Sequence, residues 1–236
     1  MALLDNIVAY YKLDNVNDSV GSFNLTNNNT VAFNSGKIGN AADGSATNTN
    51  KSLSIANNLG ITGGNITISC WVNVTTAPSA AIYAFVDQAD VTNDIEYGVV
   101  YRDVAGTKKI QYWRNKFNVA TELVTVDTTL TVGTWYHMVL TYDGTNIQGW
   151  LNGVSQGTAT ASGVGTGASD NFGCLARPVD ASGFASGLVD EVGVWTRKIT
   201  DAEVASLYNS GNGLTHPFVT DTPAYRAANV AMLKVG

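Results

Sequence analysis

Alternation of apolar and polar side chains is the main pattern along this chain. In residues 66–73, Ile66, Ile68, Cys70 and Val72 alternate with mainly polar residues, which predicts a strand with one side in a core. Short apolar runs of this kind recur through most of the sequence. They predict strands at residues 7–13, 52–55, 81–86, 95–102, 109–114, 118–126, 134–142, 147–151, 154–160, 171–176 and 187–195.

Turn signals separate these runs. Asp-Gly at 143–144 and Asn-Gly at 152–153 are strong tight-turn dipeptides. The asparagines at 27–29 divide the short strand candidates between residues 23 and 33, and a glycine-punctuated crossing follows at 36–44. Short strands spaced by turns are typical of a sandwich of two antiparallel sheets.

One short helix is expected after the last strand. Thr200 and Glu203 form a capping box, in which the Thr hydroxyl accepts the Glu203 N–H and the carboxylate reaches back to the cap N–H. Gly211 supplies a stop signal beyond the helix. The predicted fold class is therefore all-β, with one short C-terminal helix.

The composition narrows the classes of partner. Of the 236 residues, 44% are hydrophobic, which is ample for a core, and only 14% are charged. The surface is therefore polar mainly through hydroxyl and amide groups. The net charge of −6 argues against nucleic-acid binding, which needs basic patches. No apolar run approaches the length that spans a membrane.

The two cysteines, Cys70 and Cys174, each fall inside an expected strand. We interpret them as buried thiols that act as small hydrophobic side chains. A single disulfide between the sheets is the alternative, because the sequence does not place their Cα atoms.

The two ends of the chain differ from its middle. Residues 1–215 are interpreted as one domain, because the strand pattern continues without a boundary to about residue 214. Residues 216–236 form a distinct tail, which is interrupted by two prolines and then Ala-rich. A frayed terminus and a segment that docks on a partner or sister subunit are both open. The first strand begins without the regions of a signal peptide.

Separated pieces of sequence carry a family resemblance. They are residues 7–14 followed by 36–41, residues 66–72, residues 133–144 followed by 150–153, and residues 187–209. In this order they resemble the laminin-G-like modules of the concanavalin A-like lectin/glucanase superfamily, over residues 5–213. The resemblance implies a jelly-roll sandwich of two curved antiparallel sheets. Cys70 stands where the family commonly has Ala, and Trp195 where it commonly has Tyr.

Members of this superfamily include glycan binders, glycan-cleaving enzymes and adhesion modules, so the fold does not decide the function. Retaining glucanases of this fold carry Glu-x-Asp-x-x-Glu on one strand, and the chain lacks this pattern. Asp190 and Glu191 are adjacent, so we expect them on opposite faces of a strand. His137 is interpreted as a structural histidine. We therefore expect no enzyme and no catalytic residue.

Laminin-G-like modules often hold calcium, and the resemblance implies one structural ion here. Asp190 is expected on the strand side of Leu188, Val192 and Val194, where a carboxylate needs a cation, an Arg or several N–H donors. Asp43 is the second ligand by analogy with the family, because calcium takes oxygen ligands. In the alternative, Asp190 ties down a loop through backbone N–H groups.

A glycan site needs exposed aromatic rings beside hydrogen-bonding groups. Tyr97 and Tyr101 alternate on one face of their strand, and Trp113 lies nearby in sequence. These three aromatic residues, with Asp94 at the rim, are the predicted ligand-binding residues. In the alternative, the aromatic side chains belong to the core.

These features predict a non-enzymatic binding or structural protein of a virion surface, or of an extracellular setting. The module looks like those of bacteriophage decoration and fibre proteins. The expected partners are glycans or other virion proteins, with a possible homo-oligomer formed through the tail. The alternatives are a carbohydrate-binding module from a larger secreted protein and a glycoside hydrolase.

Overall fold

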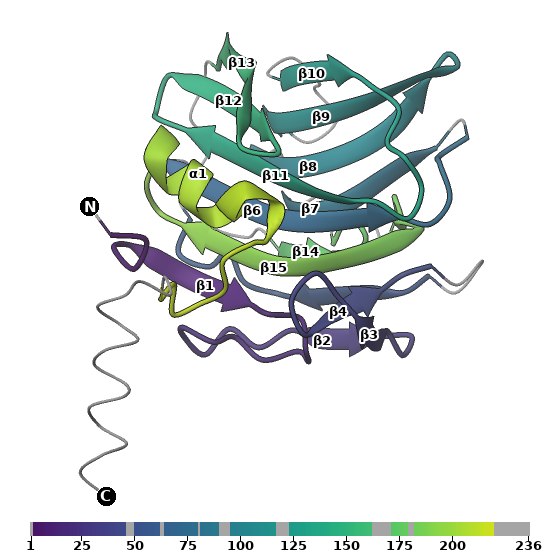
Figure 1. The fold of residues 1–236 in the computed structure, drawn as a ribbon, viewed down its shortest axis with the longest axis horizontal. Helices are drawn as coiled ribbons and strands as arrows, with labels where there is room; N and C mark the ends of the chain where they lie inside the picture. The colour runs from purple at the N-terminus through teal and green to yellow at the C-terminus, as the bar shows by residue number, and fades with distance from the viewer. Residues whose placement is uncertain are drawn as a thin grey trace, which may run out of the picture.

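The protein is a sandwich of two antiparallel sheets (Figure 1). The structure, a computed structural model, describes residues 2–45, 50–61, 64–79, 81–89, 95–116, 123–161, 171–178 and 182–219. Within these residues the first sheet has eight strands, in the order β13-β12-β11-β6-β15-β4-β3, with β1 paired to β15. The second sheet has seven, in the order β10-β9-β8-β7-β14-β5-β2. The expected sandwich is confirmed.

The strands of the first sheet are β1 (Ile7–Tyr11), β3 (Ala32–Ser35), β4 (Asn40–Asp43), β6 (Ile66–Val74), β11 (Trp135–Tyr142), β12 (Asn146–Leu151), β13 (Val154–Thr160) and β15 (Gly187–Trp195). Those of the second sheet are β2 (Thr26–Asn28), β5 (Ser52–Ile55), β7 (Ile82–Ala89), β8 (Ile95–Val104), β9 (Thr107–Lys116), β10 (Leu123–Asp127) and β14 (Asn171–Cys174). Two of these differ from the expectation: Asn27 and Asn28 lie in β2, so the break falls at Asn29, and the crossing at 36–44 contains β4.

The main core lies between the sheets, and β6 is covered on both of its faces. All nine residues of β6 are buried. Its alternate side chains from Ile66 to Val74, Cys70 among them, belong to the core cluster. On its other face, the ring of Trp71 stacks on Tyr208 of the helix at 5.8 Å. Cys70 and Cys174 are both buried free thiols, as expected.

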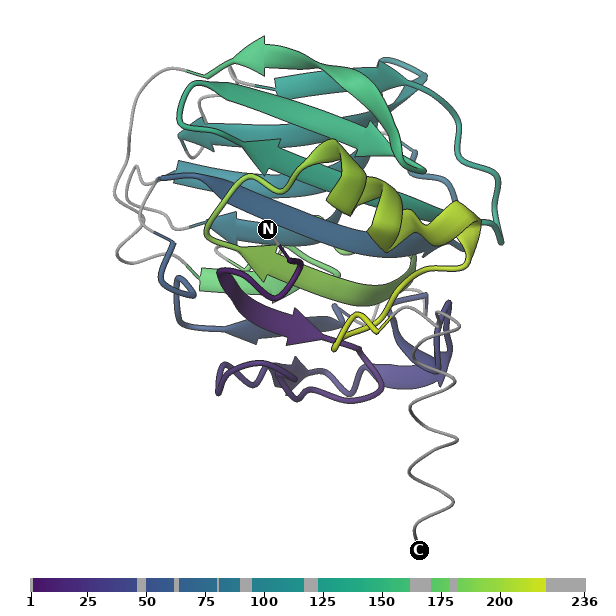
Figure 2. The same cartoon turned by 60° about the vertical axis from the view of Figure 1, so that its left-hand side comes forward.

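The helix α1 (Asp201–Tyr208) lies across the outer face of the first sheet (Figures 1 and 2). Val204 and Leu207 pack there against a second apolar cluster that includes Trp150 and Trp195. In the part of the chain that the structure describes, no helix has the length and apolar character needed to cross a membrane.

The ends of α1 are set by local hydrogen bonds. The capping box is present: the Thr200 side chain accepts the Glu203 N–H, and the Glu203 carboxylate accepts the Thr200 N–H at 2.8 Å. The helix ends earlier than the expected stop at Gly211. Asn209 takes the left-handed conformation (φ 49°) as the C-cap, because asparagine tolerates it better than most residues. Gly211 lies in the following 3₁₀ turn, η1 (Asn209–Gly211).

A β-bulge interrupts β15 and changes which way its side chains face. The register with β6 shifts between Asp190 and Gly193, and Glu191 has a φ of +50°. Val192 and Val194 point into the core, whereas Asp190 pairs with the outward-facing Trp71. The expectation that Asp190 shares its side with these valines is therefore wrong, because the bulge breaks the alternation.

Candidate functional site

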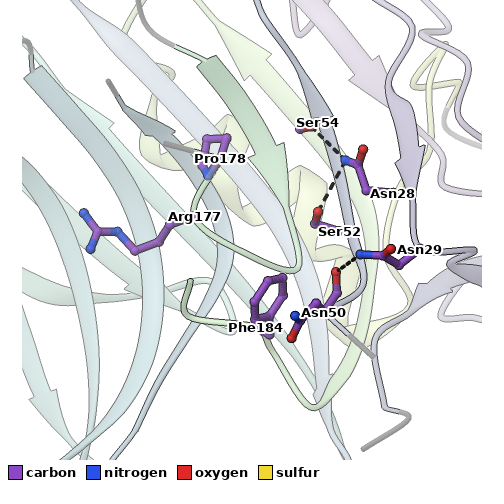
Figure 3. Close-up of a pocket in the computed structure, with 8 residues that line it drawn as sticks. All are labelled: Asn28, Asn29, Asn50, Ser52, Ser54, Arg177, Pro178 and Phe184. Carbon is purple, nitrogen blue, oxygen red and sulfur yellow. Dashed lines mark hydrogen bonds between the residues drawn. The ribbon is translucent and has the colours of Figure 1, made fainter. Parts of the chain in front are cut away.

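A pocket of about 350 Å³ opens on the outer face of the second sheet. Most of the side chains that line it are amides and hydroxyls, joined by one charged and two apolar residues. They are Asn28, Asn29, Asn50, Ser52, Ser54, Arg177, Pro178 and Phe184 (Figure 3). Ser52 and Ser54 belong to the outer face because Leu53, between them, points into the core.

The polar wall of the pocket is held by its own hydrogen bonds. The Asn28 amide donates to the Ser54 hydroxyl at 2.9 Å and to the Ser52 hydroxyl at 3.3 Å. The Asn29 amide donates to the backbone carbonyl of Asn50 at 2.8 Å. Asn28 and Ser52 also pair across β2 and β5, so the sheet itself fixes this wall.

The apolar wall comes from the segment that follows β14. The N–H of Arg177 donates to the carbonyl of Ser182 at 2.9 Å, and the N–H of Ala185 donates to the carbonyl of Leu175 at 2.8 Å. These two bonds hold the segment that carries Phe184, whose ring is half-buried. In Figure 3 the ring lies beside Asn50, and it lines the pocket.

Arg177 joins the pocket to the middle of the second sheet. Its Nε lies 3.5 Å from Oδ2 of Asp87, and its guanidinium carbon lies 6.0 Å from the ring centre of Trp113. The side chain of Asp87 is fully buried and that of Arg177 is 12% exposed. The guanidinium thus sits on the sheet, and the aliphatic stem is the part near Pro178.

One row of paired residues across the second sheet runs from Trp113 to the pocket. Trp113 pairs with Gly98, Gly98 with Asp87, Asp87 with Gly173, and Gly173 with Ser54. A Cβ at Gly98 would lie 2.9 Å from Oδ1 of Asp87, so the glycine leaves room for this carboxylate. The row therefore places Trp113, the Asp87–Arg177 pair and the pocket on one face.

The structure separates the predicted ligand-binding residues. The side chains of Tyr97 and Tyr101 are 1% and 0% exposed and belong to the core between the sheets. Trp113 lies on the opposite face, where it is 6% exposed and packs against Ala84 and Val100. Asp94 lies outside the described residues. The two tyrosines are thus core residues, the alternative left open by the sequence, and Trp113 alone shares the face of the pocket.

Sequence reasoning missed the pocket itself. Its residues lie in three separated stretches, at 28–29, at 50–54 and after β14 at 177–178 and 184, which meet through the pairing of β2, β5 and β14. One local signal was available, because Ser52 and Ser54 flank the apolar Leu53 and so predict a polar outer face for this strand.

Asp190 and Asp43 do not form a calcium site in this arrangement. The Asp190 carboxylate accepts backbone N–H groups of Lys37 at 2.7 Å, Ile38 at 3.0 Å and Glu191 at 2.8 Å. The Asp43 carboxylate instead accepts from Ser45 and Asn34. Among the described residues, no three His, Cys, Asp or Glu side chains gather as a metal site. The residues present do not fit the ion, since the lone pairs of Asp190 already accept hydrogen bonds.

Asp190 and Glu191 form a buried acidic pair on the outer face of the first sheet. Glu191 accepts a hydrogen bond from the hydroxyl of Tyr10, which packs in the cluster under the helix. The expectation that the two carboxylates face opposite ways is therefore wrong, again because of the bulge. Burial raises the pKa of Asp190 to about 8 and that of Glu191 to about 7, and the Glu191 charge adds to the shift of Asp190.

His137 is a buried histidine with a structural contact. Its Nε2 lies 2.9 Å from the Ser69 hydroxyl, and its ring lies 5.1 Å from that of Trp71. Burial lowers the pKa of His137 to about 3, which keeps the ring neutral. A buried neutral imidazole between β6 and the helix serves packing.

A smaller groove of about 260 Å³, called here the groove at the termini, lies where residues 2–4 meet residues 214–218. It is mostly apolar and is lined by Ala2, Leu3, Leu4, Glu203, Ser206, Leu214, Pro217 and Phe218. The first residues of the predicted tail belong to the folded body, because Phe218 packs on the rings of Tyr10 at 5.2 Å and Trp195 at 6.1 Å. Residues 220–236, the rest of that tail, lie outside the described residues.

Comparison with solved structures shows what this fold is similar to. Domain 4 of AbnA, an extracellular arabinanase from Geobacillus stearothermophilus solved with arabinotriose, has a TM-score of 0.65 and 21% identity. The match covers 85% of this chain and 97% of that one. The binding domain of Paraclostridial Mosquitocidal Protein 1 has a TM-score of 0.64 and 17% identity, over 88% of this chain and 52% of that one.

The ligand binding domain of botulinum neurotoxin serotype D, solved with N-acetylneuraminic acid, has a TM-score of 0.65 and 10% identity. That match covers 87% of this chain and 51% of the toxin chain, so this chain spans about half of the toxin domains. Curated protein sequences give no significant match. The identities are low, and these structures support the fold alone.

A protein-family profile matches the sequence directly. The profile is described as the concanavalin A-like lectin/glucanases superfamily and matches residues 40–205, which is more than half of the chain. The matched region runs from β4 into α1 and includes most of both sheets. The chain therefore belongs to the concanavalin A-like lectin/glucanases superfamily.

Proposed function

We propose that the protein is a non-catalytic carbohydrate-binding domain whose ligand occupies the pocket beside Phe184. The observation that carries the proposal is the pairing of a fixed amide and hydroxyl wall with an aromatic ring and a proline. A sugar presents apolar C–H faces together with a ring of hydroxyl groups, and these two walls match that chemistry. The volume is within the range of about 300–1,000 Å³ usual for ligand pockets.

The comparisons are consistent with this proposal. The family is described as lectin-like or glucanase-like, and two structural neighbours were solved with the sugars arabinotriose and N-acetylneuraminic acid. Several neighbours are described as binding domains. These similarities favour sugar binding as the activity, and the identity of the sugar is a separate question.

Buried carboxylates favour binding without hydrolysis. A glycosidase needs two carboxyl groups that reach one glycosidic bond. Asp190 is fully buried and Glu191 is 3% exposed, and both are occupied by contacts within the fold. Neither residue lines the pocket beside Phe184 or the groove at the termini.

The test is a titration of the full chain with oligosaccharides, monitored by calorimetry, after a screen on a glycan array that includes arabinotriose and sialylated glycans. We expect F184A to weaken binding at least tenfold, because it removes the ring of the apolar wall. N28A should weaken binding less, by a few-fold. The control is V154A, which changes an exposed apolar residue on the first sheet. No binding to any glycan, or equal binding by F184A, would contradict the proposal.

We further propose that the domain works on a virion surface or in another extracellular setting, with virion proteins as additional partners. Detection of the chain by mass spectrometry in purified particles tests this setting.

The apolar groove at the termini supports a homo-oligomer through the C-terminal segment, because Leu4 beside it is 50% exposed and the segment begins there. Light scattering should give a mass of at least two subunits for the full chain and of one subunit for a chain ending at Val219.

A further inference from the structure

We infer that the pocket selects a neutral glycan over an acidic one, and that Asp87 is the positioning residue responsible, because it holds and neutralises Arg177. The inference rests on the proposed function, since it names the class of sugar bound at the same pocket. It follows from three properties of the site: its charges, the burial of the ion pair and the direction of the guanidinium.

The first property is the charge of the lining residues. Among those that the structure describes, Arg177 is the one with a charged side chain, and the remainder are amides, hydroxyls and apolar groups. Asp87 supplies the opposite charge beneath it, with its Oδ2 3.5 Å from Nε of Arg177. Asp87 therefore offsets the positive charge that Arg177 would otherwise present to a ligand carboxylate.

The second property is burial. The carboxylate of Asp87 is fully shielded from solvent, and Arg177 is only 12% exposed. Opposite charges attract more strongly away from water, and removing one partner leaves the other charge uncompensated. The pair is therefore a persistent part of the site. Gly98 supports it, because a larger residue would press on Oδ1 of Asp87.

The third property is orientation. In Figure 3 the guanidinium of Arg177 points away from Phe184 and from the asparagines, so the stem is the part nearest the pocket. Its guanidinium carbon lies near the ring of Trp113, on the far side of Asp87 in the sheet register. A carboxylate on a sugar bound beside Phe184 would meet amides and hydroxyls there. The net charge of −6 on the whole chain adds long-range repulsion of anionic ligands.

The experiment compares a neutral oligosaccharide with its matched uronic-acid form, both measured by calorimetry with the full chain. We expect the unmodified protein to prefer the neutral sugar at least tenfold. We expect D87N, which keeps the shape and removes the charge, to narrow that preference at least fivefold, mainly by tighter binding of the acidic sugar.

Salt dependence gives a second measurement that needs no variant. Binding of the acidic sugar should not weaken between 50 and 500 mM salt, because Asp87 offsets the charge of Arg177 and salt screens the repulsion from the negatively charged chain. A preference for the acidic sugar, or an unchanged preference in a folded D87N, would overturn the inference and leave the proposed function standing. Failure of both sugars, and of every glycan on the array, would instead overturn the proposed function and the inference with it.

Discussion

The hydroxyl of Tyr10 donates a hydrogen bond to the carboxylate of Glu191, which joins β1 to the bulge of β15 across 181 positions of the sequence. Both groups are buried under the segment that leads away from the helix. The bulge, with Glu191 in a left-handed conformation, is what turns this carboxylate toward Tyr10. The contact therefore fixes β1 against β15.

We expect Y10F to destabilise the protein by about 1–3 kcal/mol, because it leaves the buried Glu191 carboxylate without this donor. Urea denaturation monitored by tryptophan fluorescence measures the loss. The matched control is Y136F, whose hydroxyl accepts the Thr131 N–H at the exposed surface, and we expect a loss below about 0.5 kcal/mol there. Equal effects of the two variants would show that the Tyr10 contact adds nothing special.

The same acidic residue predicts how stability depends on pH. Burial raises the pKa of Glu191 to about 7, above its usual range. A carboxyl with a higher pKa in the folded state stabilises the fold when protonated, and this contribution declines as the pH rises through the folded pKa. We therefore expect the melting temperature to fall between pH 5.5 and pH 8. Asp190, with a pKa raised to about 8, acts in the same direction.

The comparison with E191Q isolates this effect. The amide oxygen of Gln can accept the Tyr10 hydroxyl but does not titrate. As the pH rises, the melting temperature of the unmodified protein should therefore fall relative to that of E191Q. His216, near Tyr10, has a lowered pKa and is common to both proteins, so it cancels in the difference. A constant difference across the range would refute the role of Glu191.

Local patterns allowed most of the fold to be predicted from the sequence. The alternation in β6 and the capping box at Thr200 are properties of neighbouring residues, and both are present as expected. The bulge at Glu191 was not predictable in the same way, because nothing in the local composition marks a left-handed residue there. It arises where β15 pairs with both β1 and β6, whose registers are set by contacts distant in sequence.

The candidate site depends even more on distant contacts. Tyr97 and Trp113 are both aromatic and near each other in sequence, yet they face opposite sides of one sheet. The register decides this, because Trp113 pairs with Gly98 and Tyr97 pairs with Arg114. Asn28 and Phe184 approach each other only after β2, β5 and β14 have assembled. The family resemblance thus led to the prediction of a glycan ligand, and the position of the candidate pocket required the structure.

Calcium should leave the stability unchanged. An ion that binds only the folded state raises the melting temperature by mass action. The carboxylate of Asp190 already accepts three backbone N–H groups, and Asp43 is occupied by Ser45 and Asn34. We therefore expect melting curves in 1 mM calcium and in excess chelator to coincide. A rise with calcium that chelator reverses, and that D43N abolishes, would restore the calcium site expected from the family.

The packing around the bulge predicts that Gly193 tolerates no side chain. A Cβ at this position would lie 2.4 Å from Cη2 of Trp195 and 3.1 Å from Cδ2 of Tyr10. Trp195 cannot move away easily, since it is fully buried and its indole N–H donates to the Leu3 carbonyl at 2.7 Å. Overpacking of this kind costs about 1–3 kcal/mol. We therefore expect urea denaturation to show that G193A lowers the free energy of unfolding by at least about 1 kcal/mol.

The matched control for this substitution is G64A. A Cβ at Gly64 would meet none of the atoms that the structure describes within 4 Å, and the residue has no positive φ, so the same change adds a methyl group in open space. We expect its stability to differ by less than about 0.5 kcal/mol from that of the unmodified protein. If G193A were as stable as G64A, the indole of Trp195 would not be fixed by its contacts. The outer cluster under the helix would then be more adaptable than its burial and hydrogen bonding imply.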